Sequence, residues 1–180
     1  MKKTATYLIV ILVLTFMGAV AVRSGMQVLY PKRYADIVEK YSEQYGVEEN
    51  LIYAVIRTES SFDPSATSDV GAQGLMQIMP DTADWLCYRF GEDAQAVDLR
   101  DEDTAIRFGT YFLKLLQEQF GDTRTVLAAY HAGMGRVQGW LREPQYSPDG
   151  KTLQTIPFRD TAHYVDKVER AMQTYNNLYS

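Results

Sequence analysis

The chain has 180 residues, enough for one compact domain and a short appendage, and its 46% hydrophobic and 23% charged residues are ordinary for a globular protein. The formal net charge is −5; Lys2, Lys3 and Arg23 are the only charged residues among the first 23, so residues 24–180 carry 15 basic and 23 acidic side chains. An acidic domain repels phosphate backbones, and we therefore expect no nucleic-acid partner.

The N-terminal segment predicts export. Residues 7–22 contain no charge and follow two lysines, a pattern typical of a signal peptide or a membrane anchor. As a helix they rise about 24 Å, slightly less than a bilayer core. The small residues at 19–21 fit a cleavage site, but we favour a retained anchor. We therefore expect an anchor or signal at 1–23, a short linker at 24–32, and a domain at 33–180 outside the cytoplasm, secreted if the segment is cleaved.

The apolar spacing of the domain is helical almost throughout and predicts an all-α fold without internal repeats. Residues 65–74 are expected to form a polar loop, and a small hairpin within 143–155 is left open. The expected helices are 34–45 closed by Gly46, a second from Glu48 or Glu49 to the Asp63-Pro64 pair, a short one after Pro80, a longer one capped by Asp101 or Asp103 and stopped by Gly121, one from Thr123 to Ala132, one through Leu141, and a last from about Asp160.

Cysteine and histidine indicate no metal chemistry. Cys87 stands alone in an apolar run and predicts a buried, inert thiol. His131 and His163 lack a metal-ligand spacing and a third ligand, so we expect no metal site. The 13 tyrosines suit sugar binding, because each has a flat apolar face and a polar tip, but core packing explains them equally well.

One acidic residue stands out by its position. At 100° per residue, Ile52, Val55, Ile56 and Glu59 fall within about 60° of arc, so Glu59 lies on the apolar side of its helix. Partial desolvation there raises the pKa of a carboxyl group, and a protonated glutamic acid is what cleavage of a glycosidic bond requires. The alternative is a carboxylate that caps the backbone or pairs with an arginine.

Three ordered blocks carry a resemblance to a known family. Residues 58–83 read TESSFDPSATSDVGAQGLMQIMPDTA, residues 128–137 read AAYHAGMGRV, and residues 156–168 read IPFRDTAHYVDKV. Together they resemble the lytic transglycosylases with a goose-lysozyme-like (soluble lytic transglycosylase, SLT-type) catalytic domain, over about residues 34–178. The resemblance implies a lysozyme-like helical domain with a glycan-binding groove.

The resemblance also implies roles for individual residues. The matched positions are Glu59 as the sole catalytic acid/base, Ser68 as a loop serine near the reacting sugar, Gln77 and Met79 on the groove floor, Tyr130 beside the catalytic acid, and Tyr164 on the closing helix. Met79 and Tyr164 can also be read as core residues. Gly71 and Gly74 fit a need for backbone shape better than a chemical role.

Two positions depart from the family pattern. His131 stands where the family usually has asparagine, and it titrates near neutral pH. Asp160 stands where the family usually has glutamate and is one methylene shorter. We count both among the substrate-binding residues, and expect altered affinity or pH dependence without loss of activity.

The activity that the resemblance implies is cleavage of the bond between N-acetylmuramic acid and N-acetylglucosamine in peptidoglycan, with formation of a 1,6-anhydro end. It needs no cofactor, and the expected partners are glycan strands and the membrane, with the chain a monomer. Two alternatives stay open, a muramidase that hydrolyses the same bond and a non-catalytic, membrane-attached glycan-binding protein.

Overall fold

A computed structural model describes the backbone of residues 2–179 and the side chains of residues 11–179. The described residues are 67% helical and contain no strand, which confirms the all-α class. The helices are α1 Lys2–Leu29, α2 Ala35–Tyr45, α3 Glu49–Ser60, α4 Pro80–Phe90, the short 3-10 helix η1 Ala94–Ala96, α5 Glu102–Phe120, α6 Thr123–Ala132, α7 Met134–Leu141 and α8 Arg159–Tyr179.

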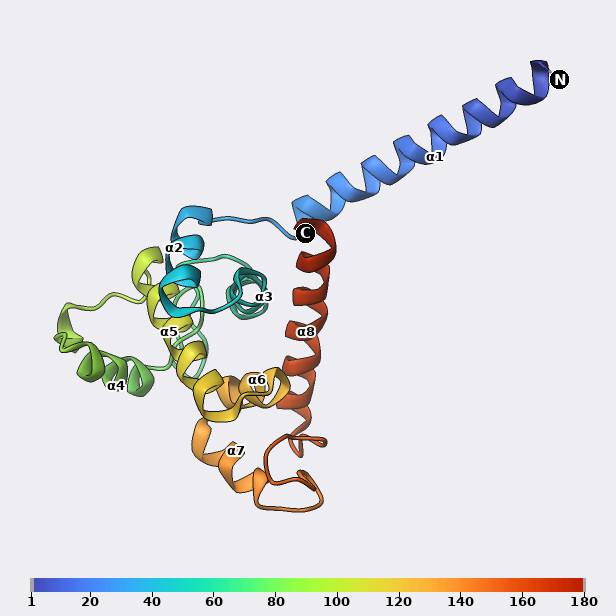
Figure 1. The fold of residues 1–180 in the computed structure, drawn as a ribbon. Helices are drawn as coiled ribbons and strands as arrows, with labels where there is room; N and C mark the ends of the chain where they lie inside the picture. Colours follow the sequence, from blue (N-terminus) through green and yellow to red (C-terminus); the bar gives the residue numbers. More distant parts are fainter. Residues whose placement is uncertain (1, 180) are drawn as a thin grey trace.

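Helix α3 lies at the centre of the domain, between α2 and α8 (Figure 1). Residues 51–56 are all buried, so the helix is apolar around most of its circumference, as a helix enclosed by neighbours must be. The predicted stripe of Ile52, Val55 and Ile56 therefore belongs to a wider apolar surface. Helix α8 packs along α3 and α6 and closes the domain.

The end of α3 differs from the expectation. The helix stops at Ser60, before the Asp63-Pro64 pair, and Ser61 and Phe62 both have positive φ. The Phe62 side chain turns into the core, where it is 2% exposed, and its backbone N–H donates to Ser60 Oγ at 3.1 Å. The free energy gained by burying the aromatic ring offsets the strain of the left-handed turn. Glycine and proline positions in the sequence do not indicate this gain.

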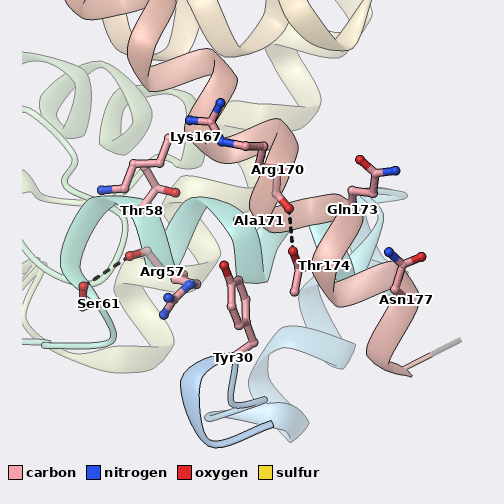
Figure 2. Close-up of a pocket in the computed structure, with 10 residues that line it drawn as sticks. All are labelled: Tyr30, Arg57, Thr58, Ser61, Lys167, Arg170, Ala171, Gln173, Thr174 and Asn177. Atoms are coloured by element: carbon pink, nitrogen blue, oxygen red, sulfur yellow. Dashed lines mark hydrogen bonds between the residues drawn. The ribbon is translucent and has the colours of Figure 1, made fainter. Parts of the chain in front are cut away.

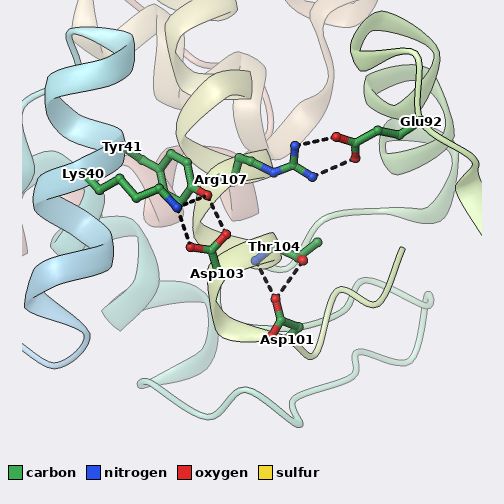
Figure 3. A network of polar contacts seen from close by, with 7 residues as sticks. All are labelled: Lys40, Tyr41, Glu92, Asp101, Asp103, Thr104 and Arg107. Atoms are coloured by element: carbon green, nitrogen blue, oxygen red, sulfur yellow. Dashed lines mark hydrogen bonds and ion pairs between the residues drawn. The ribbon is translucent and has the colours of Figure 1, made fainter. Parts of the chain in front are cut away.

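The start of α5 resolves a choice between two aspartates (Figure 3). The Asp101 carboxylate accepts hydrogen bonds from the backbone N–H and the hydroxyl of Thr104 at 2.9 and 2.8 Å, so Asp101 is the N-cap. Asp103 lies in the first turn and accepts from Lys40 Nζ at 2.9 Å and from Tyr41 Oη at 2.5 Å. Asp103 therefore joins α5 to α2.

The other helix ends largely follow their turn residues. Gly46 and Gly121 cap α2 and α5 with positive φ, and Pro80 occupies the first turn of α4, as predicted. The three-residue η1 was not predicted. Residues 143–155 form a loop, and among the described residues isolated β-bridges occur only at Thr67–Gln73 and Gln73–Ile78. Cys87 is buried, as expected.

Helix α1 projects from the domain beside the C-terminal end of α8 (Figure 1). Residues 11–29 are long and apolar enough to cross a membrane and are not buried against the protein. The helix continues to Leu29, so residues 24–29 of the expected short linker are helical. The Arg23 guanidinium donates to the Leu178 carbonyl, which holds α1 against α8. The division at residues 23 and 32 stays a prediction.

Candidate active site

Glu59 lies in the last turn of α3 and lines a pocket of about 230 Å³. The other lining residues come from the loop after α3 and from the end of α6: Ser68, Val70, Ala72, Gln77, Met79, Tyr130 and His131. The structure thus brings six of the eight candidate residues to one pocket. Glu59 is half-buried and, among the described side chains, forms no ion pair within 4.0 Å, so the alternative of an arginine-paired carboxylate has no support.

The environment of Glu59 favours its protonated form. Burial raises the pKa of Glu59 to about 7, and the contact with Tyr164 and the charge of Lys167 oppose this rise only in part. Glu59 is therefore protonated in a substantial fraction of the molecules near neutral pH. This is the state in which a carboxyl group donates a proton to a departing oxygen.

The loop from 65 to 79 forms one wall of the pocket, and Gln77 holds it in shape. Its Nε2 donates to the carbonyls of Ala66 and Gly74, each at 3.0 Å, and its backbone φ is 47°. Ser68 Oγ accepts from the backbone N–H of Ala72 at 2.9 Å. The Gln77 amide nitrogen is thus committed to the loop, and this residue positions the wall besides lining it.

Tyr130 stands beside the acid with its hydroxyl already committed. Its Oη donates to the Met76 carbonyl at 2.8 Å, and its ring centroid lies 5.3 Å from that of Phe112. Burial raises the pKa of Tyr130 well above its usual range, and the charge of Glu59 adds to the shift. Tyr130 is therefore a neutral, rigid neighbour of the carboxyl group.

Tyr164 lies outside the residues that line the pocket and contacts Glu59 from α8. The Tyr164 side chain is 7% exposed. Its hydroxyl lies close enough to the Glu59 carboxyl group to lower the pKa of that group, but it is buried without a well-formed hydrogen bond. The His131 ring packs on Tyr164 with centroids 4.5 Å apart, and His131 Nδ1 lies 3.2 Å from Thr161 Oγ1. Tyr164 is thus a core residue that also contacts the acid.

Asp160 lies in a neighbouring depression of about 380 Å³, which shares His131 with the Glu59 pocket. Burial lowers the pKa of His131, and the negative charge of Asp160 opposes the shift. Asp160 and Tyr164 are therefore the two candidates that the structure does not place among the residues lining the pocket. Met79 is 39% exposed, which excludes the core alternative for it.

Sequence reasoning missed several neighbours of the site. Val70 and Ala72 line the pocket from the loop, and Lys167 acts on Glu59 through its charge. The sequence could have indicated Lys167 as a neighbour of the site, because it follows Tyr164 by three residues and so lies on the same helix face. Within the described part of the chain, no three His, Cys, Asp or Glu side chains are grouped closely enough to hold a metal ion.

The fold and the site together define an all-helical, lysozyme-like domain with a single glutamic acid, Glu59, in an open pocket. Residues 36–152 match the model of the transglycosylase SLT domain, and the chain belongs to this family. The chain is 36% identical over 143 residues to the soluble lytic murein transglycosylase of Escherichia coli, covering 77% of this chain and 22% of that protein. It is 33% identical over 167 residues to the membrane-bound lytic murein transglycosylase C of Serratia proteamaculans, covering 79% of this chain and 46% of that protein.

Solved structures agree with the fold. An inactive mutant of the lytic transglycosylase Slt from Pseudomonas aeruginosa, carrying a glutamate-to-glutamine change, matches with a TM-score of 0.74 and 33% identity, over 85% of this chain and 25% of that one. The 70-kDa soluble lytic transglycosylase in complex with bulgecin A matches with a TM-score of 0.74 and 32% identity, over 84% of this chain and 25% of that one. The chain thus spans about a quarter to a half of the lengths of these relatives.

Proposed function

We propose that this protein is a membrane-anchored lytic transglycosylase that cleaves the β-1,4 bond between N-acetylmuramic acid and N-acetylglucosamine in peptidoglycan. The observation that carries the proposal is the half-buried Glu59, with its pKa near 7, in a pocket lined by Ser68, Gln77, Tyr130 and His131. Relatives named as lytic murein transglycosylases, one of them membrane-bound, support the substrate.

In the first step Glu59 donates its proton to the oxygen that bridges the two sugars. The bond between this oxygen and the anomeric carbon breaks, and N-acetylglucosamine departs with a new hydroxyl group. Positive charge develops at the anomeric carbon of the muramic acid, and the acetamide of the same sugar stabilises it. Retaining glycosidases usually use a second carboxylate as the nucleophile, and inverting ones use it as the base that activates water. None of the residues that line the pocket other than Glu59 carries a carboxylate.

In the second step the ionised Glu59 takes the proton from the 6-hydroxyl of the same muramic acid. The 6-oxygen attacks the anomeric carbon and closes a 1,6-anhydro ring, which restores the protonated Glu59. The nucleophile belongs to the substrate, so no entropy is lost in bringing it to the reacting carbon. A carboxyl group with a pKa near the working pH serves both proton transfers.

The surrounding residues position this carboxyl group. Tyr130, fixed on the Met76 carbonyl, and Tyr164, held under the His131 ring, confine Glu59 from two helices. Gln77 keeps the loop wall in place. Helix α1 serves as a retained anchor, because the described helix extends without interruption into contact with α8. Lys2 and Lys3 before the apolar segment favour an N-terminus in the cytoplasm, so the domain lies on the extracytoplasmic side.

The test is mass spectrometry of fragments released from purified sacculi by the full chain in a neutral detergent. We expect 1,6-anhydro ends from the parent protein. Reducing ends in their place would identify the hydrolytic muramidase. Glu59→Gln keeps the shape and loses the proton donor, and should lower the rate by about 10²- to 10⁴-fold.

A matched control is Glu143→Gln, because Glu143 is exposed in the loop after α7 and does not line the pocket. It should release fragments at the rate of the parent. A Glu59→Gln variant that clears sacculi as fast as this control would refute the assignment of the acid, and a parent chain that binds glycan without cleaving it would identify the non-catalytic alternative.

A further inference from the structure

A second and larger pocket, of about 540 Å³, lies between α3 and α8 at the base of the anchor helix (Figure 2). Its charged lining residues are Arg57 from α3 and Lys167 and Arg170 from α8. All other residues that line it are uncharged, and none is acidic. The pocket can therefore attract an anion and supply polar donors around it.

The three cations are available to a ligand. Among the described side chains, Arg57, Lys167 and Arg170 form no ion pair within 4.0 Å, although Arg124 of α6 pairs with two acids of α8. The exported part as a whole carries 23 acidic against 15 basic residues. The pocket, with three unpaired cations and no acidic side chain, is thus positively charged in a domain whose net charge is negative.

The position of this pocket is fixed relative to the anchor. Tyr30 lines the pocket and directly follows α1, and the Arg57 guanidinium lies 3.9 Å from the centroid of its ring. The Tyr179 hydroxyl donates to the Tyr30 carbonyl at 2.7 Å, and the Tyr175 hydroxyl donates to the Pro31 carbonyl at 3.1 Å. These bonds tie the segment after α1 to the end of α8, so the pocket opens beside the C-terminal end of α1.

We propose that this pocket binds the phosphate group of an anionic phospholipid in the outer face of the membrane, with Arg57 and Arg170 as its principal contacts. The inference rests on the proposed retention of α1 as a membrane anchor. Tyrosines and basic side chains at the end of a spanning helix are the groups that anchor proteins at the headgroup layer. A bound headgroup would hold the catalytic domain in one orientation on the membrane.

The depth of the pocket suits a headgroup. Arg170 precedes Leu178 by eight residues on α8, a rise of about 12 Å along that helix. Helix α8 leaves the junction at an angle to α1 and does not continue its axis (Figure 1), so the rise along α8 adds only in part to the distance from the end of α1 along the α1 axis. The polar layer of one leaflet is about 5–8 Å thick, and Arg57 lies against Tyr30 at the end of the pocket nearest to α1 (Figure 2).

The direct test is native mass spectrometry of the full chain in a neutral detergent, titrated with phosphatidylglycerol or with phosphatidylcholine of the same acyl chains. We expect one phosphatidylglycerol to bind at about tenfold lower concentration than phosphatidylcholine, and Arg57→Gln with Arg170→Gln to remove this preference. Arg142→Gln is the control, because Arg142 is exposed at the end of α7 and does not line the pocket. The single Arg170→Gln variant should lose about half of the preference for phosphatidylglycerol, expressed as a logarithm of the concentration ratio. This variant provides the test if the Arg57 change unfolds the protein.

Three results would overturn the proposal. The first is equal binding of the two lipids. The second is displacement of phosphatidylglycerol by an equal concentration of inorganic phosphate, which would identify a site for free anions. The third is a double variant that cleaves peptide-bearing sacculi more slowly but peptide-free glycan strands normally, which would assign the pocket to the carboxylates of the stem peptides. Cleavage by the parent chain in phosphatidylcholine alone tests the proposed function separately.

Discussion

The carboxyl group of Glu59 and the few side chains around it set the expected pH dependence of activity. Its pKa lies near 7 because burial disfavours the ionised form, so the rate should fall as the pH rises above about 7 and the proton is lost. The positive charge of Lys167 favours the ionised form. Replacing Lys167 with methionine should therefore move the alkaline limb of kcat/KM to higher pH.

This prediction is checked by pH–rate profiles of the parent, Lys167→Met and Lys151→Met in a neutral detergent. Lys151 is exposed in the loop before α8 and does not act on Glu59, so its replacement should leave the profile unchanged. An alkaline limb that moves equally in both variants, or to lower pH with Lys167→Met, would contradict the assigned influence of Lys167.

His131 adds a second titration close to the acid. Burial lowers its pKa below the usual 6.5, so the ring is neutral at pH 7 and can act there as a neutral hydrogen-bonding group, like the asparagine usual in the family. At acidic pH it gains a charge beside Tyr164 and the pocket, and this charge favours the ionised form of Glu59. Glu59 has a pKa of about 7 and stays protonated well below that pH, so we expect His131→Asn to match the parent at pH 7, measured as kcat/KM on sacculi; a variant much slower than the parent at pH 7 would contradict this role of the neutral ring.

The conformation of the loop from 65 to 79 depends more on Gly74 than on Gly71. Gly74 has φ of 75°, and a Cβ there would lie 1.8 Å from the Leu99 carbonyl oxygen, so alanine would displace the wall of the pocket. Gly71 has φ of 90° but open space around it. We expect Gly71→Ala to cost about 1–2 kcal/mol of unfolding free energy and Gly74→Ala more than about 3 kcal/mol.

Thermal unfolding of the two glycine variants, followed by circular dichroism, separates strain from collision. Gly74→Ala should have the lower midpoint and should also lose cleavage activity, because Gln77 bonds to the Gly74 carbonyl. Equal midpoints would mean that the approach to Leu99 is not a constraint on this loop.

Among the elements, helix existence was readable from the sequence and some helix boundaries were not. Gly46 and Pro80 mark real helix ends, because their backbone preferences are local properties. The end of α3 depends on burial of Phe62, and the role of Asp103 depends on its contact with α2, and both involve segments distant in sequence. Distant packing has no signature in local periodicity.

The whole molecule joins an apolar helix to an acidic domain through the ends of α1 and α8. Because Arg23 and the tyrosines of α8 hold this junction, we expect the chain to keep its first 23 residues and to fractionate with membranes. Intact-mass measurement of the protein from the membrane fraction checks this, with the full chain at 20.5 kDa as the expected species. A product that begins after residue 21 would show a cleaved signal and would also remove the basis of the lipid site.

The sequence by itself determined the helical class, the resemblance to lytic transglycosylases and the place of Glu59 on an apolar helix side, because periodicity, turn residues and motif order are local in the chain. Only the tertiary structure decided which side chains meet around that acid, that Asp160 lies in a neighbouring depression, and that Arg57 and Arg170 share a pocket near the end of α1. Those outcomes depend on how α3, α6 and α8 pack, and the free energy of that packing comes from contacts between residues far apart in sequence.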